Sequence, residues 1–317
     1  MLKYIKRKLM RRDILRSRME TTMKSGVVIL YKEGGMSSQG AVSRLKRLLG
    51  ADKAGHTGTL DPMATGVLPI LVGRGVKASE YVTSEDKHYR ATLLLGITTD
   101  TEDVTGEVLT ECNDIPDEAT VRQAVVDMVG EREQIPPMYS AIKVGGKKLY
   151  ELAREGKEIE REARLITVFS IGCERISERE YTLDVHCSKG TYIRTLCADI
   201  GASLGCGGVM KTLERTECAG YTLSDAKTLA EIEAMSDREA AILPTEEIFK
   251  NLRKITLTPF FARLARCGVE IYLKKSGIRA EIGERVTLFD EHGFFALGEV
   301  REFEAGAAIK PIKQFDV

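Results

Sequence analysis

The feature that most constrains this chain is a glycine-punctuated run of twelve residues, Gly55-His56-Thr57-Gly58-Thr59-Leu60-Asp61-Pro62-Met63-Ala64-Thr65-Gly66. Its glycines let the backbone pass close to something large, because they carry no Cβ. Asp61 is the one carboxylate in the run, and the apolar segment 67–72 that follows predicts a buried strand. An Asp-Pro pair alone more often marks a turn or a helix N-cap. The whole run instead predicts a loop that presents one carboxylate.

Composition sets the general class of the protein. The 317 residues are 43% hydrophobic and 30% charged, which is typical of a soluble globular protein with one large domain and a small one. No apolar run is long enough to span a membrane. The seven cysteines are scattered, form no Cys-x-x-Cys pair and do not cluster with the four histidines. This usage predicts a reducing, cytoplasmic setting and argues against a disulfide framework or a zinc site.

The net charge of zero conceals a basic N-terminus. Residues 1–24 carry nine Lys and Arg against two Asp and Glu, so the rest of the chain is acidic overall. We expect residues 1–24 to be a poorly ordered extension: a phosphate-binding arm, an organellar presequence, or an upstream extension with Met23 as the true start. An acidic body is not typical of a nonspecific nucleic-acid binder, so any RNA contact must come from local basic patches.

Residues 25–245 read as one domain in which strands and helices are interspersed. A helix is expected from Ser37 or Ser38, which can serve as N-caps, to Gly50, which can end it. Further strands and helices follow from hydrophobic periodicity: strands at 26–31, 67–72, 88–96, 165–175 and 180–187, and helices at 117–129 and 191–205. Because strands and helices do not alternate strictly, the pattern predicts an α+β architecture around a mixed sheet.

Two other segments differ from this pattern. Residues 136–164 form a long connection with seven Lys and Arg and five Glu, and connections of this length are usually functional. The plainer alternative is a solvated, salt-bridged helix and hairpin. From about residue 246, short segments with strand character are separated by turn residues such as the Asp-Glu-His-Gly sequence at 290–293. This predicts a small β-rich C-terminal module at 246–317.

Four blocks, in this order, resemble the tRNA pseudouridine(55) synthases, the family that isomerises a uridine in the tRNA T loop. They are Lys32-Glu33-Gly34-Gly35-Met36-Ser37-Ser38, the Asp61 run, Asp86-Lys87-His88-Tyr89-Arg90, and His186-Cys187-Ser188-Lys189-Gly190-Thr191-Tyr192-Ile193-Arg194-Thr195-Leu196. Glu33 stands where the family usually has proline. The resemblance implies a central mixed, largely antiparallel sheet flanked by helices and loops. It also implies a thumb-like RNA-binding insertion at 136–164 and a PUA-like RNA-binding domain at 246–317.

Uridine isomerisation limits the chemistry that such a site needs. The N1–C1′ bond breaks, the base rotates and a bond forms through C5, so no electrons are gained or lost and no group is imported. We therefore expect neither a redox cofactor nor a metal, and the segments 145–148 and 205–208 lack the spacing of a P-loop and a dinucleotide fingerprint. An ionised carboxylate can act as nucleophile or base. The resemblance implies that Asp61 is this group, and leaves open covalent addition at C1′ or C6 and abstraction of a sugar proton to give a glycal.

The resemblance also supplies partners for Asp61. Arg194, otherwise a surface arginine, is implied to lie beside it, where a guanidinium opposes the rise in carboxyl pKa that burial causes. Position 194 lies near the start of a predicted helix, where a cation is disfavoured unless an anion is close. Tyr89, otherwise an ordinary strand aromatic, is implied to stack on the target base with its hydroxyl near the sugar.

The remaining candidate residues are expected at the RNA. The target uridine must be unstacked at a cost of a few kcal/mol, and His56, otherwise a turn histidine, can occupy the vacated stacking space. Tyr192 and Leu213 are implied to line the base pocket. Basic contacts to RNA are expected from Lys32, Lys143, Lys147 and Lys148.

These observations predict a monomeric enzyme that acts on the T stem-loop of tRNA. One alternative is a noncatalytic tRNA-binding or folding protein on the same scaffold, and another is a synthase of the same family that acts on a different RNA. Asp61, Tyr89 and Arg194 argue against the first, because a pure binder does not need a buried ion pair at the base pocket.

Overall fold

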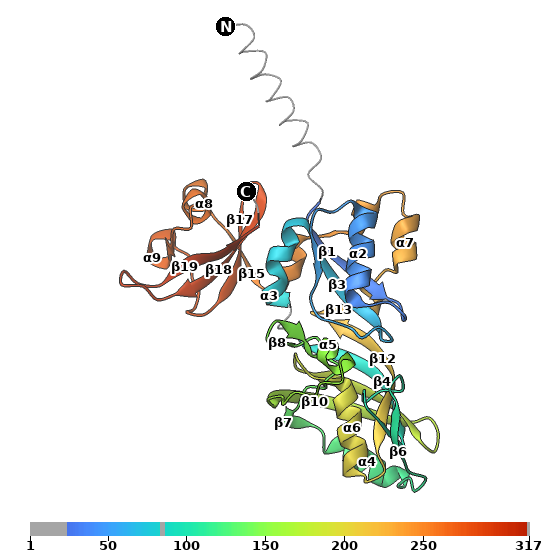
Figure 1. Cartoon of the computed structure of the whole chain (residues 1–317). Coiled ribbons are helices and arrows are strands. Elements are labelled where there is room, and N and C mark those ends of the chain that lie inside the picture. The colour runs from blue at the N-terminus through green and yellow to red at the C-terminus, as the bar shows by residue number, and fades with distance from the viewer. Residues whose placement is uncertain (1–23, 83–85, 316–317) are drawn as a thin grey trace.

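The computed structural model describes residues 24–82 and 86–315, so the predictions for residues 1–23 lie outside the described part of the chain. A large α+β body is followed by a smaller β-rich body, which lies to one side of it in Figure 1. In the described ranges, no helix combines the length and the apolar character that crossing a membrane would need.

Within these ranges the large body is built on a ten-stranded sheet. Eight of the strands follow one another in the order β14 (Leu243–Pro244), β1 (Gly26–Lys32), β3 (Thr65–Val72), β12 (Gly208–Cys218), β4 (Lys87–Leu95), β11 (Glu180–Cys187), β10 (Arg164–Arg175) and β7 (Gly130–Gln134). Of the other two, β2 (Ala54–His56) pairs with β3, and β13 (Tyr221–Thr222) pairs with β12. The β12–β3 pair is parallel and the other pairs of this sheet are antiparallel. The predicted α+β class with a mixed, largely antiparallel sheet is confirmed.

The first helix of the described chain begins and ends where its capping residues predict. Helix α2 (Ser38–Leu49) has Ser37 as its N-cap, whose side chain accepts from the Gly40 N–H, and it ends at Gly50 with φ 64°. The other helices of the large body are α3 (Ser79–Val82), α4 (Glu118–Val126), α5 (Leu149–Arg154), α6 (Ile193–Ser203) and α7 (Leu229–Ala234). Helix α6 buries Leu196, Cys197 and Ile200 in the main core, as its predicted apolar face requires.

Strand β4 alternates between two environments. Lys87 and Tyr89 are buried on one side of the sheet, whereas His88 and Arg90 are more exposed on the other. Tyr89, Leu213 of β12 and the apolar face of α6 belong to one core cluster. The candidate site residues of β4, β12 and α6 therefore share one side of the sheet.

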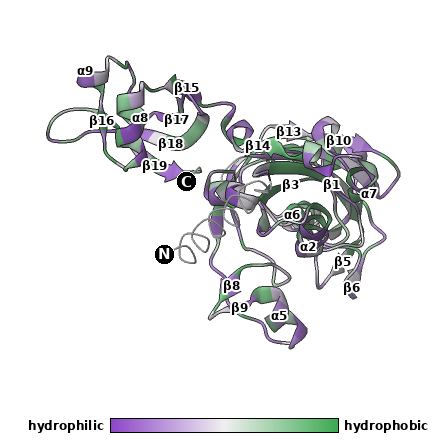
Figure 2. Ribbon diagram, turned by 90° about the horizontal axis from the view of Figure 1, so that it is seen from above, coloured by the Kyte–Doolittle hydropathy of each residue, from purple (hydrophilic) through white to green (hydrophobic). Residues whose placement is uncertain are grey.

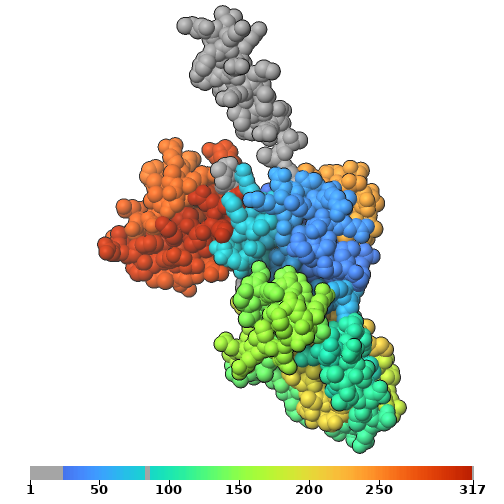
Figure 3. All heavy atoms as spheres, in the orientation of Figure 1, coloured from blue at the N-terminus to red at the C-terminus, as the bar shows by residue number. Residues whose placement is uncertain are grey.

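Residues 136–164 form a lobe that projects from the large body in Figure 2. It contains a hairpin of β8 (Lys143–Val144) and β9 (Lys147–Lys148), then α5. Glu155 pairs with Lys147 at 3.0 Å and with Lys157 at 2.8 Å, so the salt-bridged hairpin and helix of the plainer alternative are present. In Figure 3 the lobe lies at the junction between the N-terminal part of the body and the rest of it. The structure of this lobe is therefore compatible with both interpretations, a solvated hairpin and a functional insertion.

The C-terminal body contains a five-stranded sheet, within the described residues, in the order β15 (Arg253–Thr256), β17 (Arg285–Asp290), β18 (Gly293–Arg301), β19 (Ala308–Gln314) and β16 (Ile271–Tyr272). Helices α8 (Pro259–Arg266) and α9 (Leu273–Ser276) accompany it. The predicted turn at 290–293 connects β17 to β18. This body packs on the large one through Tyr81, Phe249, Phe294 and Phe315, and Lys313 pairs with Glu80 at 2.8 Å.

Candidate active site

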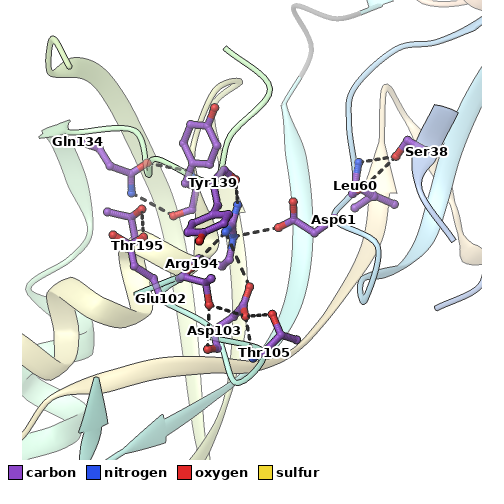
Figure 4. A network of polar contacts seen from close by, with 12 residues as sticks. Ser38, Leu60, Asp61, Glu102, Asp103, Thr105, Gln134, Tyr139, Arg194 and Thr195 are labelled. Atoms are coloured by element: carbon purple, nitrogen blue, oxygen red, sulfur yellow. Dashed lines mark hydrogen bonds and ion pairs between the residues drawn. The ribbon is translucent and has the colours of Figure 1, made fainter. Parts of the chain in front are cut away.

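Asp61 and Arg194 form an ion pair at the centre of the network in Figure 4. The Arg194 Nε lies 2.9 Å from Asp61 Oδ2, and the arginine side chain is only 5% exposed. The same guanidinium donates to the carbonyls of Thr101 (3.1 Å) and Tyr139 (2.8 Å) and lies 3.8 Å from Asp103 Oδ2. Arg194 therefore connects the Asp61 loop, the 100–106 loop and the lobe from the first turn of α6.

Asp103 is the second carboxylate of this network, and the sequence analysis did not identify it. Its Oδ1 accepts from the Thr101 hydroxyl and from the backbone N–H and hydroxyl of Thr105, at 2.5–2.9 Å. The loop connects β5 (Ile97–Thr99) to β6 (Val108–Glu111). The Asp-x-Thr spacing signals such a turn. It does not show that the turn faces Arg194, which lies far along the chain.

The electrostatics of Asp61 are set by opposing effects. Burial raises the pKa of this carboxyl, Arg194 and Lys32 oppose the rise, and the charge of Asp103 adds to it, with a net shift upward. The expected opposition from Arg194 is therefore present but does not outweigh burial and Asp103. A carboxylate of raised pKa is a stronger base when ionised, and it can act as a nucleophile or base at its loop position.

Lys32 lies under this loop. Its side chain is 1% exposed, and its ammonium donates to the carbonyls of Glu33 (3.0 Å), Pro62 (3.2 Å) and Ala64 (2.6 Å). Burial lowers its pKa to about 8. Lys32 was expected to contact RNA, but its three donors are occupied by backbone oxygens, which points to a role in holding the loop. Glu33, at the usual proline position, keeps its side chain exposed.

Ser38 holds the other side of the loop. Its hydroxyl donates to the Leu60 carbonyl and accepts from the Leu60 N–H, both at 2.8 Å (Figure 4). The residue before Asp61 is thus fixed by the start of α2. The first sequence block, residues 32–38, therefore has a structural function, because Lys32 at the end of β1 and Ser38 at the start of α2 both hold the backbone beside the carboxylate.

The glycines of the run serve different purposes. Gly66 has φ 105°, and a Cβ there would lie 2.2 Å from the carbonyl oxygen of Arg215 on the neighbouring strand β12. The close approach expected at this position is therefore to the protein's own backbone. A Cβ at Gly55 would meet nothing within 4 Å, and one at Gly58 would make ordinary contacts at 3.5 Å or more.

One cavity, of about 520 Å³, brings together half of the predicted site residues, including the three predicted to be catalytic. Those that line it are Asp61, Tyr89, Tyr192, Arg194 and Leu213. Burial raises the pKa of Tyr89 to about 12, so its hydroxyl keeps its proton near neutral pH. The cavity is also bordered by Lys87, Arg164, Lys189 and Arg215, which give it a basic wall suited to an anionic backbone.

A second cavity, of about 810 Å³, is lined by the same ion pair. His56 lines it from the end of β2, where it pairs with Ile70 rather than lying in an open turn. Burial lowers the His56 pKa, and Arg215 and Lys148 lower it further, so the ring is neutral. Its Nδ1 has no hydrogen-bond partner among the described residues. A flat, neutral ring in this wall fits the stacking function expected of His56.

The three hairpin lysines differ in position. Lys148 lines the second cavity and lies 5.3 Å from the Tyr150 ring centroid. Lys147 is paired with Glu155, and Lys143 is exposed on the hairpin. Lys143 and Lys147 line neither cavity, so the structure brings only Lys148 to the site.

Two further residues near the site escaped the sequence analysis. Gln134, at the end of β7, accepts from the Tyr192 N–H (2.8 Å) and donates to its carbonyl (3.1 Å), which secures the start of α6. Arg215 is 1% exposed and follows Leu213 by two residues on β12. Strand periodicity places both on one face, and this signal could have found Arg215. In the described part of the chain, no group of three or more His, Cys, Asp and Glu is placed to hold a metal ion.

We expect the Asp103→Asn variant to shift the pH dependence of the single-turnover rate. Because the charge of Asp103 raises the Asp61 pKa, its removal lets Asp61 ionise at lower pH, so the acid limb moves to lower pH. The plateau rate falls about tenfold, since Arg194 loses one of its two carboxylate neighbours. The matched control is Asp184→Asn, an exposed aspartate that pairs with Arg90 outside both cavities. An unchanged acid limb would contradict the coupling of Asp103 to Asp61.

Comparisons with known families give one answer. The chain matches the TruB family pseudouridylate synthase (N terminal domain) over residues 46–193 and the tRNA pseudouridylate synthase B C-terminal domain over residues 194–250. It is 44% identical over 281 residues to tRNA pseudouridine synthase B of Alkaliphilus oremlandii, covering 87% of this chain and 93% of that one. The enzyme of the same name from Clostridium tetani is 40% identical over 277 residues, covering 87% and 95%.

Solved structures show the same architecture. A chain in the crystal structure of a Cbf5-Nop10-Gar1 complex aligns with a TM-score of 0.72 at 25% identity, over 94% of this chain and 87% of that chain. A chain in the structure of an H/ACA RNP bound to a substrate RNA containing 2′-deoxyuridine aligns with a TM-score of 0.71 at 23% identity over the same shares. At 23% identity, the second similarity is evidence for the fold alone.

Proposed function

We propose that this chain, which belongs to the TruB family of pseudouridylate synthases, isomerises uridine 55 in the T loop of tRNA. It is an RNA pseudouridine synthase, and its relatives at 40–44% identity bear the name tRNA pseudouridine synthase B. The observation that carries the proposal to the residue level is the Asp61–Arg194 ion pair in the wall of the cavity that also contains Tyr89.

Asp61 is the group we propose to react with the target nucleotide. A nucleotide inside a folded loop must leave its stack to reach an enzyme group, and the cavity of about 520 Å³ is of the size that encloses small ligands. Tyr89 and Leu213 form apolar walls for the base, while Arg194 holds the carboxylate in one orientation. His56, in the neighbouring cavity, takes the stacking place of the extruded base.

The partner we propose is the T stem-loop of tRNA, bound by a monomer in the cytoplasm. The second cavity is lined by Lys148 and Arg154 of the lobe, and the first by Lys189, which precedes α6 in the chain. These cations can neutralise phosphates. The higher identity to tRNA pseudouridine synthase B than to the Cbf5-complex chain favours tRNA over another RNA. A noncatalytic binder does not account for a buried ion pair at the cavity wall.

The experiment that tests this function maps pseudouridine in an unmodified tRNA transcript treated with the pure protein, by carbodiimide labelling and primer extension. We expect one stop, at position 55, and the same product in an isolated T stem-loop. A transcript with cytidine at position 55 is the control and should give no stop. Modification at another position, or none in any tRNA, would contradict the proposal.

A further inference from the structure

Arg215 lines the first cavity and is only 1% exposed. From β12 its Nε donates to the Val67 carbonyl at 2.7 Å and its Nη2 donates to the Gly58 carbonyl at 3.2 Å. Val67 belongs to β3 and Gly58 to the loop that carries Asp61. One guanidinium thus ties the Asp61 loop to the strand that follows it.

Tyr89 is the third neighbour of this guanidinium. Residues 215 and 89 face each other directly across the antiparallel β12–β4 pair, and both line the first cavity. The positive charge of the guanidinium opposes the rise in the Tyr89 pKa that burial causes, so the two groups interact across the strand pair. Arginine has donors only, so in any hydrogen bond between them the tyrosine oxygen is the acceptor.

Burying the positive charge of Arg215 costs free energy, because its ionisable neighbours are mostly basic side chains. In the described part of the chain, Arg215 forms no ion pair with a carboxylate, and its charge lowers the pKa values of Lys32, His56 and Lys87 nearby. Burying a guanidinium without a carboxylate partner is unfavourable unless its donors are used. Here two donors are used on backbone carbonyls, which an apolar side chain could not satisfy.

We propose that Arg215 is a positioning residue that fixes the Tyr89 hydroxyl relative to the Asp61 loop. In this arrangement the hydroxyl oxygen accepts from the guanidinium, so its own proton is directed away from Arg215 and is available to a nucleotide in the cavity. The same guanidinium fixes the position of the Asp61 loop through its hydrogen bond to the Gly58 carbonyl. This inference rests on the proposed function, in which Tyr89 contacts the target nucleotide.

A double-mutant cycle between Arg215→Lys and Tyr89→Phe tests the coupling. Lysine keeps the charge but lacks the fork of donors that reaches several acceptors. We expect Arg215→Lys to slow the single-turnover rate about thirtyfold with Tyr89 present and less than about fivefold in the Tyr89→Phe background, with tRNA affinity changed less than about threefold. Equal effects in both backgrounds would overturn the proposal, because Arg215 would then act independently of the hydroxyl.

The control for this cycle is Arg90→Lys, an exposed arginine on β4 whose substitution should leave the rate unchanged. If the Arg215 variants do not fold, or Tyr89→Phe has no measurable turnover, nitrogen-labelled arginine NMR reads the contact directly. One protected guanidinium signal should shift between the native protein and Tyr89→Phe, and it should not be the signal lost in Arg194→Lys. No shifted signal would overturn the contact. This readout needs no turnover, so it stands apart from any failure of the proposed function.

Discussion

We expect the Asp61→Asn variant to form no detectable pseudouridine, with a single-turnover rate lower by at least about 10⁴-fold. Asparagine has the same shape and still accepts from the Arg194 Nε, which lies 2.9 Å from Asp61 Oδ2. It lacks the negative charge that a nucleophile or base requires. Affinity for tRNA should stay within about tenfold, since ~1.4 kcal/mol covers such a change. Quench-flow turnover and filter binding measure the two effects separately.

The chain offers a matched control for this substitution. Asp184 pairs with Arg90 Nε at the same 2.9 Å, but both side chains are more than half exposed on the other side of the sheet. Asp184→Asn should leave turnover and binding unchanged, because an exposed ion pair contributes little. Turnover by Asp61→Asn beyond what deamidation of the asparagine explains would remove Asp61 from the reaction.

Arg194→Lys should be the second most damaging substitution, slowing single turnover by about 10²-fold or more. The guanidinium reaches Asp61 and the carbonyls of Thr101 and Tyr139 at once, and a lysine ammonium cannot match this planar set of donors. Apparent tRNA affinity should change much less, because the contacts are to the protein rather than to phosphate. Single-turnover rate and binding at two salt concentrations give the measurement.

A phosphate-binding arginine would behave in the opposite way. Binding would weaken, its salt dependence would become shallower, and turnover at saturating RNA would stay nearly normal. That outcome would contradict the placement of Arg194 beside the reacting group. Arg90→Lys is the control here as well, since Arg90 has the same Nε–carboxylate distance but is 59% exposed.

Local signals in the sequence were sufficient for α2 and α6, but they did not give β12, which carries Leu213 and Arg215 of the site. Ser37 and Gly50 define the ends of α2, and the apolar spacing of 193–200 gives α6 with Arg194 in its first turn. Such features depend on neighbouring residues alone, through capping and periodicity. The resemblance to a family added the pairing of Arg194 with Asp61, which no local pattern contains.

Contacts between distant segments could not be predicted in this way. Asp103 reaches Arg194 because the β5–β6 connection folds back on α6, and Lys32 points to the loop carbonyls because β1 lies beside β3. The sequence shows each residue type but not which face of which strand lies opposite. Gly66 shows the same limit, because its close approach is to Arg215 of the parallel neighbour β12.

The most direct test of the account is the structure of the protein bound to a T stem-loop. We expect nucleotide 55 to leave its stack and enter the first cavity, with its base between Tyr89 and Leu213 and its ribose against the Asp61 carboxylate. We also expect His56 to occupy the vacated stacking place. A nucleotide 55 that remains stacked in the loop, or that lies in the second cavity against Tyr139 and Tyr150 away from Tyr89, would contradict it.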